Sequence, residues 1–249
     1  MTQKLKKRVA IVVGSTSGIG EAIAKEYASQ GARVVITGRT KDKGEKIVKE
    51  ITDNGFQASF YQVDVSDEEQ CKALIEDTYK RYNQIDILVN NAGIAKATPM
   101  EDLEIEQWDR TFDINIRSYF ILTKAALPYL QKSDNGNILF TSSMASIKAF
   151  DQQYAYGTTK AGVSHFARMV AVGYGNKGVR SNAIAPGVID TEILANAPKE
   201  YIDSIVEGIP MNRLGKAEEI AKVATFLASD DASYITGQVI SVCGGASIV

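Results

Sequence analysis

The sequence has little of what metal sites and disulfide frameworks need. Its 249 residues contain one histidine and two cysteines, and Cys71 and Cys243 form no Cys-x-x-Cys pair. These counts exclude a multi-histidine metal site and favour neither a zinc site nor a disulfide framework. We therefore expect no bound metal and two free thiols in a reducing cytoplasm. His165 lies among apolar residues of an expected helix, where packing is a more common role than catalysis.

Excess charge of one sign and long apolar runs are also lacking. The 28 basic residues nearly balance 30 acidic ones, for a net charge of −2, which argues against a nucleic-acid partner. No stretch approaches the roughly 20 apolar residues needed to cross a bilayer. The basic start at residues 4–8 precedes only a short apolar run that ends at Gly14, which is too short for a signal-peptide core. We expect a soluble, cytoplasmic protein with a small-molecule substrate and no membrane partner.

Short β-branched runs alternate with longer helical patterns along the whole chain, which is typical of parallel βαβ units. Strands are expected at 8–13, 33–37, 58–62, 87–90, 137–141, 180–185 and 239–242, and helices at 21–30, 68–82, 105–131, 155–176 and 217–228. The fold class is therefore α/β: a single doubly wound domain over residues 1–249, with a seven-stranded parallel sheet and helices on both faces. Ser66 and Glu69 fit a capping box at one helix start.

Only residues 186–215 interrupt this rhythm, with scattered prolines and glycines in a helix-prone insert. An insert of that length between the sixth strand and the last helix is a candidate lid over a ligand site.

A glycine-rich turn follows the first strand and leads into a helix. Its spacing is GxxxGxG, formed by Gly14, Ser15, Thr16, Ser17, Gly18, Ile19 and Gly20. Glycines there permit a tight turn and a close approach of the backbone to a pyrophosphate, while the helix N-terminus directs free N–H groups at the anion. The turn predicts a dinucleotide site, and the three hydroxyl residues could contact the same phosphate.

The end of the second strand indicates which dinucleotide is bound. NAD enzymes place an acid there to hold the ribose 2′-hydroxyl, but this strand ends in Gly38 and Arg39. A guanidinium binds a 2′-phosphate, whereas an acid would repel it. We expect NADP (NADPH), with NAD as the alternative; Asp42, the nearest acid, fits the first turn of the next helix.

Tyr156 and Lys160 are four residues apart on an expected helix, so both side chains project from one face. An ammonium about 4 Å from the phenol would favour the phenolate by up to about 4 kcal/mol at an effective dielectric near 20, or roughly three pKa units. Alone the pair is weak evidence for catalysis, because about one Tyr-x-x-x-Lys is expected by chance among 11 tyrosines. Ser142 and Ser143 close the fifth strand, and a serine hydroxyl beside the phenol could hold a substrate oxygen.

Together these motifs resemble the short-chain dehydrogenase/reductase family over essentially the whole chain. The matching segments are Gly14 to Gly20, Asp64 with Val65, Asn90 to Gly93, Asn115, Ser143, Tyr156 to Lys160, and Pro186 and Gly187 with Thr191. The resemblance implies a Rossmann domain and an oxidoreductase that transfers hydride between a nicotinamide and a ketone or secondary alcohol.

The resemblance also implies roles for individual residues. Asn115, Ser143, Tyr156 and Lys160 would be catalytic, with Asn115 kinking its helix to hold a water that links Lys160 to solvent. Cofactor contacts would come from Asp64, Val65, Asn91, Ala92, Gly93, Tyr156, Lys160, Pro186, Gly187, Ile189 and Thr191. The long helices after strands four and five and the last strand would form a homotetramer.

Three positions depart from the family pattern. Val13 replaces the usual threonine, whose hydroxyl ties the turn to the Asn91 region, so the turn could be looser; Cys243 and Ser181 are also unusual. None of these belongs to the expected catalytic set.

Several functions remain open. The segment 210–237 resembles 3-oxoacyl-acyl carrier protein reductases, but the residues after Gly93 lack the Thr-Arg-Asp of the fatty-acid enzymes. We therefore favour an NADPH-dependent reductase of general ketones, with the acyl carrier protein reductase as the alternative. A non-catalytic dinucleotide sensor typically loses the tyrosine or lysine, and an epimerase or dehydratase usually needs a longer substrate domain.

Overall fold

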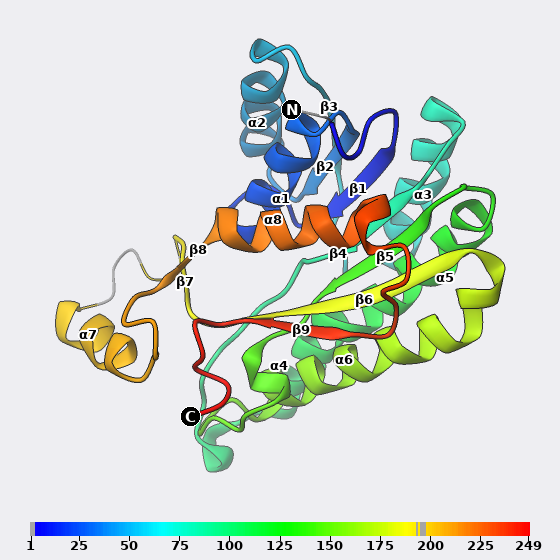
Figure 1. Ribbon diagram of the computed structural model, residues 1–249. Helices are drawn as coiled ribbons and strands as arrows, with labels where there is room; N and C mark the ends of the chain where they lie inside the picture. The colour runs from blue at the N-terminus through cyan, green and yellow to red at the C-terminus, as the bar shows by residue number, and fades with distance from the viewer. Residues whose placement is uncertain (1–2, 193, 195–197) are drawn as a thin grey trace.

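A computed structural model describes residues 3–192, 194 and 198–249. Seven parallel strands form one sheet in the order β3-β2-β1-β4-β5-β6-β9 (Figure 1). The strands are β1 (Val9–Val13), β2 (Arg33–Gly38), β3 (Gln57–Gln62), β4 (Ile87–Asn90), β5 (Gly136–Thr141), β6 (Val179–Pro186) and β9 (Val239–Val242). The predicted seven-stranded doubly wound sheet is confirmed. Strand order reverses between β1 and β4, which is where such sheets open a crevice for a ligand.

Helices cover both faces of the sheet, as expected for right-handed crossovers. They are α1 (Gly18–Ser29), α2 (Lys41–Asp53), α3 (Glu68–Tyr82), α4 (Ile105–Phe112), α5 (Ser118–Leu130), α6 (Tyr154–Tyr174), α7 (Lys199–Glu207) and α8 (Ala217–Ala228). Alternate residues of β1 enter opposite cores: Ala10 and Val12 pack with α1, α2 and α8, whereas Ile11 and Val13 pack with α3, α5 and α6. Every residue of β1 is buried, so the strand reads as a continuous apolar run.

The helix expected over 105–131 contains a π-helical segment, Asp113–Arg117, between α4 and α5. Asn115 is fully buried in this segment. π-Turns inside α-helices are common at functional sites because they redirect one side chain. The helix is therefore irregular at Asn115, where a kink was expected.

The cap of α3 differs from the prediction. Asp67, not Ser66, is the N-cap, and its carboxylate accepts a hydrogen bond from the Gln70 backbone N–H at 3.0 Å. Ser66 instead donates its hydroxyl to Asp64 at 2.8 Å. The carboxylate wins the cap position because it also complements the positive end of the helix dipole.

The insert at 186–215 is anchored at both ends by a two-stranded parallel sheet, in which β7 (Ile189–Asp190) pairs with β8 (Gly215–Lys216). Helix α7 extends away from the main sheet (Figure 1). Residues 193 and 195–197 of this insert lie outside the described part of the chain.

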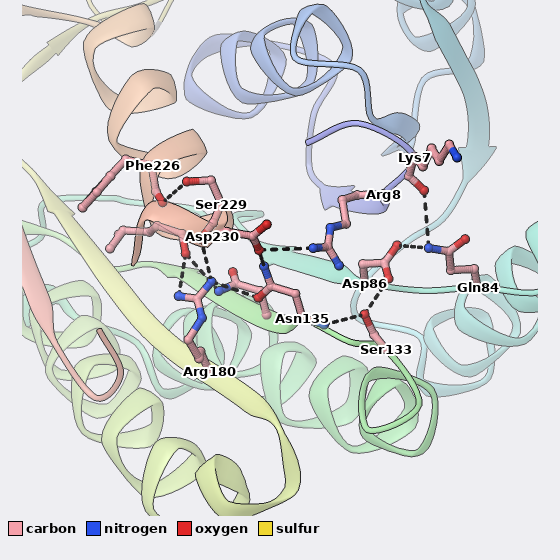
Figure 2. A network of polar contacts seen from close by, with 12 residues as sticks. Lys7, Arg8, Gln84, Asp86, Ser133, Asn135, Arg180, Phe226, Ser229 and Asp230 are labelled. Carbon is pink, nitrogen blue, oxygen red and sulfur yellow. Dashed lines mark hydrogen bonds and ion pairs between the residues drawn. The ribbon is translucent and has the colours of Figure 1, made fainter. Parts of the chain in front are cut away.

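A polar network lies at the end of the sheet where strands β1, β4, β5 and β6 begin (Figure 2). Asp86 is almost fully buried and accepts the Val9 N–H at 2.7 Å. Arg180 donates to the carbonyls of Leu227 at 2.8 Å and Ser229 at 3.2 Å. A guanidinium at these carbonyls satisfies acceptors that a helix C-terminus leaves free, so Arg180 fixes the end of α8.

Helix α8 in turn packs along α1, and Tyr27 of α1 donates its hydroxyl to the Ala224 carbonyl at 3.1 Å. The network therefore holds the helix whose N-terminus faces the ligand crevice. Within the described residues, no helix combines the length and the apolar character that crossing a membrane requires.

Candidate active site

A cleft of about 580 Å³ opens at the carboxyl ends of the strands. Its lining comes from the glycine turn, the ends of β2, β4 and β5, the start of α6 and the segment after β6. Nearly all the site residues expected from the sequence line this one cleft; Ser15 and Asn115 do not.

Two glycines of the turn, Gly14 and Gly20, leave no room for a side chain. Gly14 has φ +69°, and a Cβ there would lie 2.7 Å from the Ala92 Cα. A Cβ at Gly20 would lie 2.2 Å from the Gly14 carbonyl oxygen. The turn therefore leaves the backbone bare at the N-terminus of α1, where N–H groups and the helix dipole favour a pyrophosphate.

Ser15 does not face the cleft, which corrects the expectation that its hydroxyl contacts phosphate. It is fully buried, donates its hydroxyl to the Val12 carbonyl at 2.6 Å and accepts the Thr37 N–H at 2.9 Å. Its own backbone N–H also donates, to the Thr37 carbonyl. Both groups are thus used to join β1 to β2, while Thr16 and Ser17 do line the cleft.

Hydrogen bonds hold the glycine turn in place although Val13 replaces the threonine usual at this position. The Asn91 amide donates to the Gly14 carbonyl at 2.9 Å, and the Thr141 hydroxyl donates to the Asn91 amide oxygen at 3.0 Å. The Gly14 N–H donates to the Thr37 hydroxyl at 3.1 Å. Thr37 was missed from the sequence, although a polar residue ending a buried apolar strand is a signal for such a contact.

Arg39 and Asp64 lie at the adenosine end expected for the cleft. Arg39 is exposed, and its carbonyl is held by the Gln62 side chain at 2.9 Å. Hydrogen bonds from the Ser66 backbone and hydroxyl lower the pKa of Asp64, with smaller help from Arg39 and Arg110. Asp64 is therefore a fixed anion that can accept a hydrogen bond from an amino group.

Ser143, Tyr156 and Lys160 meet at the centre of the cleft. Ser143 follows β5, and a contact with its hydroxyl favours the ionised form of Tyr156. The Lys160 ammonium lies 5.6 Å from the centre of the Tyr156 ring and donates to the Thr141 carbonyl at 2.7 Å. Neighbouring Ser142 instead anchors α6 by donating to the Lys160 carbonyl at 3.0 Å.

The electrostatics correct the expectation that Lys160 lowers the pKa of Tyr156. Burial raises the pKa of Tyr156, and the Ser143 contact only partly opposes that rise. Burial also lowers the pKa of Lys160 to about 7. Removing the lysine from water disfavours its charge, and so weakens the interaction through which it would have acted on the phenol.

Asn115 is held beside this group without facing the cleft. Its amide pairs with both the N–H and the carbonyl of Ile94, each at 2.9 Å, and also donates to the Thr159 hydroxyl at 3.2 Å. A Cβ added to Gly93 would lie 3.3 Å from the Asn115 oxygen and 3.5 Å from the Lys160 nitrogen. Asn115 therefore fixes the strand-end segment against Lys160, and Thr159 is a second residue that the sequence analysis missed.

The end of β6 and the segment after it line the cleft with Pro186, Gly187, Val188, Ile189 and Thr191. Thr191 lies over the glycine turn, since a Cβ at Gly18 would come within 3.5 Å of its methyl group. The start of the 186–215 insert and the glycine turn therefore lie next to each other.

Known proteins are similar to this chain in sequence and architecture. A family model described as enoyl-(acyl carrier protein) reductase matches residues 13–247. The 3-oxoacyl-[acyl-carrier-protein] reductase FabG of Thermotoga maritima is 36% identical over 98% of this chain and all of its own length. A 3alpha-hydroxysteroid dehydrogenase of Mediterraneibacter gnavus is 35% identical over 99% of both chains. A Beutenbergia cavernae structure, proposed to be an NAD(P)-dependent gluconate 5-dehydrogenase and holding NADP at low occupancy, superposes with TM-score 0.93 at 34% identity over 99% of both chains.

Proposed function

This chain belongs to the short-chain dehydrogenase/reductase family and is an NAD(P)-dependent oxidoreductase of carbonyl and alcohol groups; from that premise we propose that it is an NADPH-dependent reductase of general ketones. The observation that carries the proposal is the meeting of Ser143, Tyr156 and Lys160 in one cleft with the bare glycine turn. A bound nicotinamide would supply the hydride for the carbonyl carbon.

Several features of the cleft support a phosphorylated dinucleotide as the cofactor. The turn from Gly14 to Gly20 offers N–H groups where added Cβ atoms would collide with backbone, so a pyrophosphate can approach. Arg39 would hold the 2′-phosphate, with Thr16 beside it, because a Cβ on Gly38 would lie 2.6 Å from the Thr16 methyl group. Asp64 and Val65 would receive the adenine, and Ile189 and Thr191 would fix the carboxamide.

Tyr156 would donate the proton. Its raised pKa keeps the phenol protonated at neutral pH, which is the state that a general acid needs. The Ser143 hydroxyl would bond the same substrate oxygen and stabilise its growing charge. Lys160, with a pKa of about 7, can both lose and regain a proton at neutral pH, so it suits a relay that returns a proton to Tyr156. Asn115 would support that relay.

A second candidate function is the reduction of a 3-oxoacyl thioester. The similarity to the Thermotoga maritima reductase supports it. We rank it below the general ketone reductase because residues 94–99 lack the sequence expected of the fatty-acid enzymes.

We also propose that the protein assembles as a homotetramer. Phe120 of α5 and Met169 and Val172 of α6 expose 50%, 58% and 87% of their surfaces, and the centre of the Phe120 ring lies 6.3 Å from that of Phe166 of α6. Apolar groups gathered on two neighbouring helices favour an interface. Light scattering should give about four times the 27.0 kDa chain mass, and a monomer would contradict the proposal.

The catalytic assignment is tested by Tyr156→Phe, which removes only the donated hydroxyl. We expect ketone-dependent NADPH oxidation to fall at least about 1,000-fold, while the NADPH dissociation constant measured by fluorescence changes less than about threefold. Tyr154→Phe, two residues away on the same helix, is the matched control and should keep its activity. Retained turnover in Tyr156→Phe would refute the mechanism.

A further inference from the structure

The walls of the cleft next to the catalytic group are mainly apolar. The apolar lining residues there are Ile94, Met144, Phe150, Val188 and Leu194. They belong to the segments that follow β4, β5 and β6, the same segments that carry Gly93, Ser143 and Gly187. A substrate body that reaches past Ser143 and Tyr156 therefore meets mainly hydrocarbon.

The charged groups of the described lining lie away from this wall or already have a partner. Among the described residues, the charged lining is Arg39, Asp64, Lys160 and Glu192. Arg39 follows β2 and Asp64 follows β3, both on the side expected for the adenosine. Lys160 donates to the Thr141 carbonyl. Glu192 is exposed and its carboxylate pairs with the Lys43 ammonium at 3.7 Å, so it contributes little net charge to the wall. A carboxylate moved into such a site loses its hydration without gaining a cation.

Gln153 supplies a neutral polar group in this wall. It precedes the catalytic helix as the N-cap of α6, and it lines the cleft. Its backbone N–H donates to the Phe150 carbonyl, and none of the hydrogen bonds found among the described residues uses its side-chain amide. The preceding Gln152 is exposed, and its carbonyl accepts the Thr98 N–H at 2.8 Å, which joins two cleft-forming loops.

Resting on the proposed function, we propose that the substrate is an uncharged, mainly apolar ketone, because the apolar wall penalises a carboxylate, and that Gln153 is a specificity-determining residue that pairs with a neutral polar substituent. A half-buried amide can pair with a neutral hydrogen-bonding group, whereas the apolar wall penalises an anion that loses its hydration there.

The test compares two ketones that differ only in charge: 4-oxocyclohexanecarboxamide and 4-oxocyclohexanecarboxylate at pH 7. We expect kcat/KM of the wild-type protein with NADPH to be at least about 30-fold higher for the carboxamide. Gln153→Lys places an ammonium in the wall and should reduce that ratio at least about tenfold. Gln152→Lys makes the same change one residue outside the cleft and should leave the ratio within about twofold.

Each outcome separates the inference from its premise. If neither ketone, nor cyclohexanone, supports oxidation of NADPH or NADH, the proposed function fails and the inference fails with it. If the carboxylate is reduced as well as the carboxamide, only the substrate class is overturned. If the wild-type ratio is as expected but both lysine variants change it equally, the specificity role of Gln153 is overturned.

Discussion

Replacing the buried Lys160 with methionine should stabilise the protein while it destroys activity. The lysine is 3% exposed, and burial lowers its pKa from 10.5 to about 7. A shift of that size disfavours the folded state by about 4 kcal/mol at pH 7. Losing the hydrogen bond from Lys160 to the Thr141 carbonyl destabilises the variant by about 1–3 kcal/mol, because the acceptor is left without a donor. The net gain for Lys160→Met is therefore about 1–3 kcal/mol at pH 7.

The pH dependence gives this prediction its sign. The folded lysine has the lower pKa, so the unfolded chain binds more protons between about pH 7 and pH 10.5. The contribution of Lys160 to the free energy of unfolding therefore rises with pH over that window. The destabilisation that it causes is fully present only below about pH 7. By pH 9.5 the penalty falls to about 1 kcal/mol, so the advantage of Lys160→Met should shrink by about 3 kcal/mol.

Urea unfolding at pH 7 and pH 9.5 measures this difference, followed by the fluorescence of the single tryptophan, Trp108. Samples need equal protein concentration and no added cofactor, because both ligand and assembly shift apparent stability. Lys222→Met, at an exposed position of α8, is the control and should change stability by less than about 0.5 kcal/mol at either pH. A Lys160→Met protein that is less stable by the same amount at both pH values would refute the argument.

Two further substitutions test the cofactor site. Arg39→Asp replaces the guanidinium expected at the 2′-phosphate with a repelling charge, so the NADPH to NADH ratio of kcat/KM should fall at least about 30-fold; an unchanged ratio, or an equal fall in the remote variant Arg81→Asp, would refute the assignment. Gly14→Ala should weaken NADPH binding at least about tenfold, because the added Cβ would meet Ala92 at 2.7 Å. Gly55→Ala is its control: that glycine also has positive φ but has open space at its Cβ position, so binding should be unchanged, and equal losses in both variants would show that backbone strain alone is responsible.

Spacing and order along the chain predicted the framework of the site. The turn from Gly14 to Gly20 follows a buried strand, and the topology of a doubly wound sheet then requires that turn, Asn91 and Ser143 to meet at one edge, because parallel strands bring their carboxyl ends together. The four-residue spacing of Tyr156 and Lys160 likewise places both on one face of α6. These features depend on local geometry and chain direction, which the sequence determines.

The tertiary structure decided what each polar group does. Ser15 and Ser17 are equivalent hydroxyls in the sequence, but Ser15 faces inward to bond Val12 and Thr37, while Ser17 lines the cleft. Two adjacent polar residues preceded α3, and only the packed chain showed that Asp67 caps the helix and Ser66 bonds Asp64.

The same distinction applies to the pair of Tyr156 and Lys160. The sequence determined that Tyr156 and Lys160 would be neighbours, together with the fold and the cofactor turn. It could not determine that Lys160 would be nearly fully buried and bonded to the Thr141 carbonyl. Protonation depends on the water and dipoles around a group, and these come from segments far apart in the chain. Burial therefore reversed the direction in which the pKa of Tyr156 was expected to move.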